Sequence, residues 1–76
     1  MPTIHNEDGF RFHFYPNDHN PPHLHVKYGD GIAKIEIETG EIIDNFGMKT
    51  KDLRRALAIV ERNKALFLLK FREIIK

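Results

Sequence analysis

The sequence HLHVKYGDGIAKIEIE, residues 23–38, decides the fold, because it holds two alternating segments joined by a turn. In residues 23–28 Leu, Val and Tyr alternate with polar side chains, and in residues 32–38 Ala and Ile do the same. Strict alternation is typical of a strand with one buried face and one solvated face. The Gly-Asp-Gly of residues 29–31 has the composition of a tight turn. We therefore predict an antiparallel hairpin that buries its apolar side.

Strands are also predicted on both sides of this hairpin. Residues 10–15, FRFHFY, alternate cleanly, with three Phe on one face, and they follow turn-forming residues at 6–9. Residues 1–5 are a possible edge strand, and residues 41–44 form a short strand after Thr-Gly. The pattern predicts a three- or four-stranded antiparallel meander.

Chemically active side chains gather on the outer face of this predicted sheet. Alternation places them there, but the register between strands cannot be obtained from the pattern, so which of them meet is not determined. The predicted outer-face residues are Arg11, His13, Tyr15, His23, His25, Lys27, Lys34, Glu36 and Glu38.

The inner face needs a helical cover. Thr50 is the predicted N-cap of a first helix, Asp52 suits its first turn, and a break is expected near residues 62–64. A second helix over residues 64–75 is apolar around most of its circumference, which favours an interface with a second copy or a partner. The apolar stripe of the first helix is Leu53, Ala56, Leu57 and Val60.

The predicted fold class is therefore α+β, a single domain over residues 1–76. Residues 1–48 form its sheet half, and residues 49–76 form a half of two helices that cover one sheet face. A chain this short buries about 60–65% of its unfolded surface, so any site should be a surface groove or an interface.

Composition excludes several classes of function. The chain has no Cys, which excludes disulfides and thiol catalysis, and no Ser to act as a nucleophile. Neither a glycine-rich phosphate loop nor a dinucleotide fingerprint is present. No apolar run approaches the ~18 residues of a membrane span, and no leader is recognisable, so we expect a cytoplasmic protein that does not enter a membrane.

Charge is divided unevenly along the chain. Residues 1–48 hold three basic and eight acidic side chains, whereas residues 49–76 hold nine basic and three acidic ones. Such polarity can dock the two halves together or present a basic surface to nucleic acid.

The candidate site is residues 18–26, DHNPPHLHV, which hold three of the five histidines. In a strand His23 and His25 lie on the same face with Cα atoms about 6.5 Å apart. The two prolines before them fix φ and stiffen the lead-in, which could hold His19 near the start of the strand.

A family resemblance rests on four segments: residues 1–4 (MPTI), residues 18–26, residues 33–35 (AKI) and residues 40–43 (GEII), followed by an amphipathic helical tail. Together they resemble the small bacterial proteins of domain-of-unknown-function family 4160. The resemblance implies a toxin–antitoxin pairing with a cognate small partner protein. Phe71 stands roughly where the family tail often has Trp. The positions that match the family signature are Asp18, His19, Pro21, Pro22, His23 and His25.

The first functional hypothesis is a nucleic-acid-directed protein, an RNase-like toxin held by its partner. Imidazole can serve as acid and as base near neutral pH, so the candidate catalytic residues are His23, His25 and His19. Arg11, Lys27 and Lys34 are candidates for binding phosphate, and His13 and Tyr15 for stacking on bases.

Two alternatives stay open. A metal-binding module would use His23, His25, His19 and Asp18, with His13 as a further candidate, to hold a transition metal such as zinc. A non-catalytic interaction protein would instead bury His23 or His25 against backbone carbonyls and bind its partner, or a second copy, through the apolar last helix.

Overall fold

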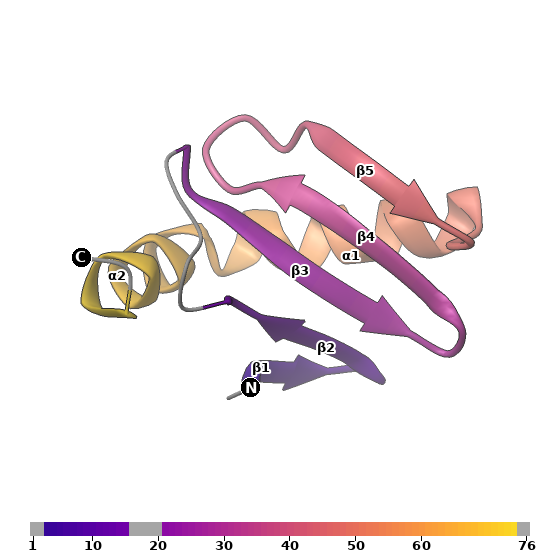
Figure 1. The fold of residues 1–76 in the computed structure, drawn as a ribbon, viewed down its shortest axis with the longest axis horizontal. Coiled ribbons are helices and arrows are strands. Elements are labelled where there is room, and N and C mark those ends of the chain that lie inside the picture. Colours follow the sequence, from indigo (N-terminus) through magenta and orange to yellow (C-terminus); the bar gives the residue numbers. More distant parts are fainter. Residues whose placement is uncertain (1–2, 16–20, 75–76) are drawn as a thin grey trace.

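Five strands and two helices make up the computed structural model, which describes residues 3–15 and 21–74. The strands form one sheet in the order β1-β2-β3-β4-β5, every neighbouring pair is antiparallel, and α1 runs behind the sheet (Figure 1). The elements are β1 (Thr3–Glu7), β2 (Phe10–His13), β3 (His23–Tyr28), β4 (Gly31–Glu36), β5 (Ile42–Phe46), α1 (Thr50–Arg62) and α2 (Lys64–Ile74).

The predicted α+β class is confirmed, but the predicted count of three or four strands is wrong. The first and last segments of the sheet are both strands, because β1 pairs with β2 and β5 pairs with β4. Each edge strand contains a register shift, and neither alternates cleanly in sequence, so the pattern understated them. The last strand also extends to Phe46, two residues beyond its predicted end.

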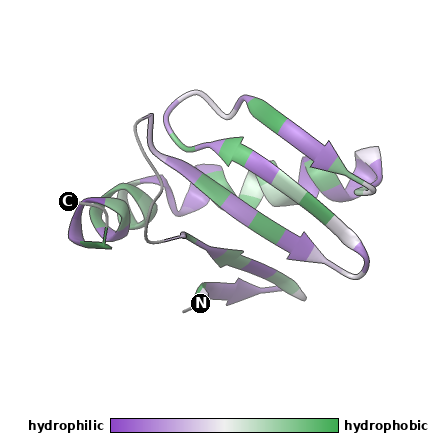
Figure 2. Cartoon of the chain, viewed as in Figure 1, coloured by the Kyte–Doolittle hydropathy of each residue, from purple (hydrophilic) through white to green (hydrophobic). Residues whose placement is uncertain are grey.

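The predicted hairpin is confirmed, but β4 ends at Glu36, so Ile37 and Glu38, which were predicted to continue the strand, lie in a turn. Tyr28 pairs with Gly31, which leaves Gly29 and Asp30 as the two-residue loop, and Gly29 has a φ of 58° that glycine adopts without strain. Figure 2 shows apolar and polar residues alternating along β3 and β4. The apolar side of the sheet packs against α1 and α2, where Phe10, Phe12, Leu24 and Ile35 are fully buried.

The first helix begins one residue earlier than predicted. Lys49 has extended backbone angles and occupies the N-cap position, so Thr50 is the first helical residue and not the cap. The predicted break is confirmed at Asn63. Its N–H bonds to the carbonyls of Ile59 and Val60, and its own carbonyl accepts the N–H of Phe67 at 2.8 Å, so one residue ends α1 and starts α2.

The second helix buries one side only. Phe67 and Phe71 are buried, whereas Leu66 and Leu69 are 39% and 53% exposed. The predicted apolar exposure on the last helix is therefore present. Neither α1 nor α2 is long and apolar enough to cross a membrane.

A polar network centred on Glu7 ties the edge strand β1 to the junction of the helices. Its carboxylate accepts the Nε2–H of His5 at 3.0 Å and the Nδ2–H of Asn63 at 3.3 Å, and it pairs with Arg62. The His5 ring also lies 5.3 Å from Phe67, centroid to centroid. Polar contacts therefore hold β1 to the end of α1 and to Asn63, and an aromatic contact holds it to α2.

Candidate functional site

Strand register brings His13 of β2 opposite His25 of β3. Their rings are stacked, with centroids 5.5 Å apart and an interplanar angle of 18°. On its other side His25 is opposite Lys34 of β4, which in turn is opposite Asp44 of β5. Residues paired across antiparallel strands point to the same face, so these four side chains form one row across the outer face, which we call the histidine row.

Tyr15 completes an aromatic cluster with two members of this row. Its ring meets His25 edge-on at 4.4 Å and His13 edge-on at 5.1 Å, centroid to centroid. The Tyr15 side chain is 40% exposed, and both histidines are half-buried. We call His13, Tyr15 and His25 the ring cluster. It offers π surface and imidazole nitrogens at one place on the sheet.

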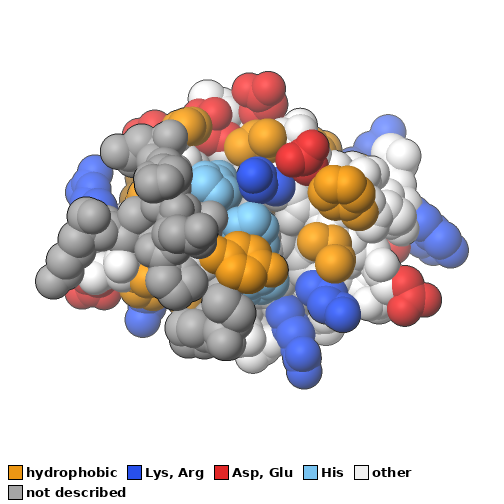
Figure 3. All heavy atoms as spheres, in the orientation of Figure 1, with side chains coloured by type: hydrophobic (Ala, Val, Ile, Leu, Met, Phe, Trp, Pro, Cys, Tyr) orange, Lys and Arg blue, Asp and Glu red, His pale blue; other side chains and the backbone are white. Residues whose placement is uncertain are grey.

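Two cations lie side by side next to the ring cluster. Arg11 is opposite Lys27 in the row beside the histidine row, and both are exposed. Figure 3 shows the histidines in pale blue near the centre of this face, with Lys and Arg side chains in blue to their right and below them. The five predicted nucleic-acid-binding residues therefore share one surface: Arg11, His13, Tyr15, Lys27 and Lys34.

His23 lies in a different environment from His25. It is 8% exposed, its ring lies 6.1 Å from that of Phe71 in α2, and its Nδ1 lies 2.9 Å from the carbonyl oxygen of Pro21. Because a carbonyl only accepts, the Nδ1 carries the hydrogen and donates it. The expectation that His23 faces solvent is therefore wrong. The ring is buried because α2 returns to this end of the sheet, where Phe71 also packs on Phe14 at 5.2 Å.

The remaining predicted site residues, Asp18 and His19, lie outside the described residues. Within residues 3–15 and 21–74, no three His, Asp or Glu side chains are placed to hold one metal ion. His23 and His25 have ring centroids 5.4 Å apart, at an interplanar angle of 72°.

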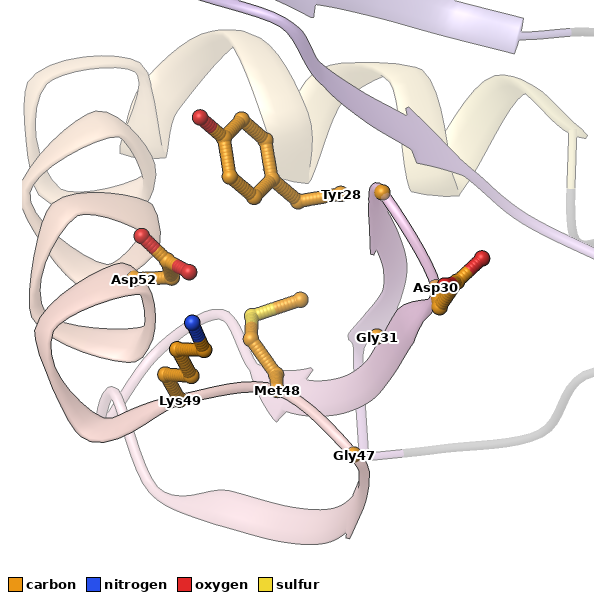
Figure 4. A pocket seen from close by; sticks show the side chains of 8 residues that line it. Tyr28, Asp30, Gly31, Gly47, Met48, Lys49 and Asp52 are labelled. Carbon is orange, nitrogen blue, oxygen red and sulfur yellow. The ribbon is translucent and has the colours of Figure 1, made fainter.

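A pocket at the opposite end of β3 was not expected from the sequence. It has a volume of about 360 Å³ and lies where the β3–β4 hairpin meets the start of α1 (Figure 4). Asp52, one of its lining residues, pairs with Arg55 at 3.6 Å, and Arg55 in turn donates to the Tyr28 hydroxyl at 3.5 Å. Its lining residues are Tyr28, Gly29, Asp30, Gly31, Gly47, Met48, Lys49 and Asp52.

Comparison with known families matches residues 9–72 to DUF4160, a domain of unknown function. The match spans β2 to α2, and it includes the ring cluster and the cation pair. The chain belongs to the DUF4160 family. Comparison with curated proteins found no match, and comparison with solved structures found none.

Proposed function

We propose that this DUF4160 protein binds single-stranded RNA on the outer face of its sheet. The observation that carries the proposal is the placement of the ring cluster directly beside the cations Arg11 and Lys27. Domains that bind single-stranded nucleic acid combine aromatic stacking platforms with cations that follow the phosphates. The outer face has both parts on adjacent strands.

The distribution of charge supports this surface despite the acidic balance of the sheet half. Its three basic residues, Arg11, Lys27 and Lys34, all lie on the outer face. Most of its described acidic residues lie at turns or are paired: Asp8, Asp30, Glu38 and Glu41 lie at or next to turns, and Glu7 is paired with Arg62. Among the acidic residues that the structure describes, only Glu36 and Asp44 share the outer face, at its margins. An anionic chain lying over β2 and β3 therefore meets cations first.

The finer form of the proposal is RNA cleavage by a toxin-like protein. Cleavage without a metal needs a base for the 2′-OH, an acid for the leaving oxygen and a cation for the phosphate. His13 and His25 offer two imidazoles on adjacent strands, and Lys34 is the cation opposite His25. We give His23 the role of holding the Pro21 carbonyl, and so the end of the proline loop, at the edge of the ring cluster.

The exposed leucines of α2 favour a protein partner as a second candidate function. Leu66 and Leu69 are three residues apart, so they share a side of the helix, and this side is separate from the buried Phe67 and Phe71. A cognate partner, as the family resemblance implies, would cover these leucines. This candidate is compatible with an RNA-binding outer face.

Binding of an unstructured 12-nucleotide RNA, measured by fluorescence anisotropy between 50 and 200 mM salt, tests the proposal. We expect the Arg11→Ala/Lys27→Ala variant to bind more weakly. The slope of log K against log[salt] should decrease in magnitude by about 1.4, because each of the two phosphate contacts on a single strand contributes about 0.7.

The matched control is Lys51→Ala/Arg54→Ala, which removes two exposed cations of α1. It should bind as the natural protein does. If the control loses binding and the sheet variant does not, the basic helices are the RNA-binding surface. If the natural protein shows no salt-dependent binding, the proposal fails.

Cleavage is tested separately with the same RNA and with a copy that is 2′-deoxy throughout. We expect products from the RNA alone, in the presence of EDTA, and none with His25→Ala. Products that disappear with EDTA and return with zinc would instead support the metal-dependent alternative.

A further inference from the structure

The row that holds the two cations continues across the sheet as an apolar surface. Lys27 is opposite Ile32 of β4, and Ile32 is opposite Phe46 of β5. Both apolar residues are exposed, Ile32 at 42% and Phe46 at 67%. Of the large hydrophobic side chains in the described part of the chain, Phe46 has the greatest exposure. One row therefore presents Arg11, Lys27, Ile32 and Phe46 in order.

We propose that Phe46 is a second stacking position for an RNA base, so that a bound strand crosses the sheet from Tyr15 to Phe46. This inference rests on the proposed RNA binding and adds the path of the strand. Tyr15 and Phe46 are three strand spacings apart, about 14 Å, and four residues apart along the strands, about 13 Å. The diagonal between them is about 19 Å, which suits a strand of roughly four nucleotides or more.

Charge complementarity favours RNA over a protein as the occupant of this surface. By register, Lys34 lies on the diagonal between Tyr15 and Phe46, and Lys27 flanks that diagonal in the row of Phe46, so a ligand that follows the diagonal must accept positive charge beside an aromatic ring. Single-stranded RNA alternates phosphates with flat bases and meets both requirements. Asp44 ends the histidine row on β5, and its carboxylate repels phosphate there. The bound RNA is therefore directed past Lys27 towards Phe46.

The alternative occupant is a second copy of the chain at the edge of the sheet. β5 is an edge strand, and it carries Ile43, 40% exposed, next to Asp44. Exposed apolar edge strands can pair with another chain. The experiment therefore includes the oligomeric state.

The test compares Phe46→Ala, Phe46→Leu and Phe46→Trp in binding to unstructured RNAs of 4 and 12 nucleotides. Stacking losses on alanine substitution predict about 5- to 160-fold weaker binding of the 12-mer by Phe46→Ala. Phe46→Leu should also bind the 12-mer more weakly than the natural protein, because leucine keeps apolar contact but has no ring. Phe46→Trp should bind it at least as tightly as the natural protein. Leu69→Ala, an exposed apolar residue on α2, is the matched control and should leave RNA binding unchanged.

The outcomes separate this inference from the proposed function. If Phe46→Ala binds the 12-mer normally while Arg11→Ala/Lys27→Ala does not, the outer face binds RNA but Phe46 is not on its path. If Phe46→Leu binds as the natural protein does, stacking at Phe46 is wrong. If sedimentation shows that Phe46→Ala converts a dimer to a monomer with unchanged RNA affinity, the patch is an interface between copies. If the natural protein binds no RNA, the proposed function itself fails.

Discussion

The imidazole of His23 links three parts of the molecule: strand β3, the carbonyl of Pro21 and the ring of Phe71 in α2. Replacing His23 by Ala removes a hydrogen bond and leaves space in a buried site. We expect His23→Ala to lower the free energy of unfolding by about 1–3 kcal/mol, measured by urea denaturation. Strand alternation places His23 on the outer face and does not by itself predict this loss.

His25→Ala is the matched comparison, because its half-buried ring lies on the outer face. It should cost less than about 1 kcal/mol. His23→Asn should recover part of the loss, because its side-chain amide can donate from near the position of Nδ1. Equal losses for His23→Ala and His25→Ala would contradict the structural role given to His23.

At the scale of elements, the close approach of Gly31 to Met48 determines how the chain passes from β5 into α1. A Cβ on Gly31 would lie 2.7 Å from the Cα of Met48, so the backbone of one segment would have to move. The connection is also held by Asn45, whose side chain accepts the Met48 N–H at 2.9 Å and donates to its carbonyl at 3.0 Å. Hairpin and helix start are therefore packed backbone to backbone.

We expect Gly31→Ala to lower the free energy of unfolding by about 1–3 kcal/mol and Gly31→Asn to lower it further, because the larger side chain meets the same backbone. Gly29 has open space around it and a φ of 58°, so the order should reverse there, with Asn tolerated better than Ala. Urea denaturation of the four variants measures whether the Ala or the Asn variant is the more stable at each of the two positions. If Asn is better than Ala at both positions, backbone conformation and not packing against Met48 limits position 31.

At the scale of the whole molecule, the Glu7 network connects residues that are more than fifty positions apart. The hydrogen bond from His5, followed by that from Arg62, lowers the pKa of Glu7 below its usual value of 4.5. Since the unfolded chain then binds the proton more readily, this contribution to stability is complete above about pH 4.5 and is lost as the pH falls through the lowered pKa.

We therefore expect the urea midpoint of the natural protein to fall more steeply below about pH 4.5 than that of Glu7→Gln. Glu61→Gln changes an exposed glutamate of α1 and should follow the natural protein. Parallel curves for the natural protein and Glu7→Gln would show that the Glu7 network does not contribute to acid sensitivity.

The sequence by itself determined the local elements. Alternation places the strands because successive side chains point to opposite faces, and the polar residues Asn63 and Lys64 interrupt an apolar helical stripe, so the break between helices was predictable. It also placed the five nucleic-acid-binding candidates on the outer face, because each occupies a polar position of a predicted strand. The edge strands were underestimated because pairing, not alternation, defines them.

Only the tertiary structure decided which of these residues meet. A strand can slide along its neighbour without changing its own pattern, so the pairing of His13 with His25, and of Ile32 with Phe46, depends on register. The burial of His23 depends on α2 docking Phe71 against the start of β3, a contact between residues 48 positions apart. Local sequence specifies the direction of a side chain, and the docking of distant elements specifies what it contacts.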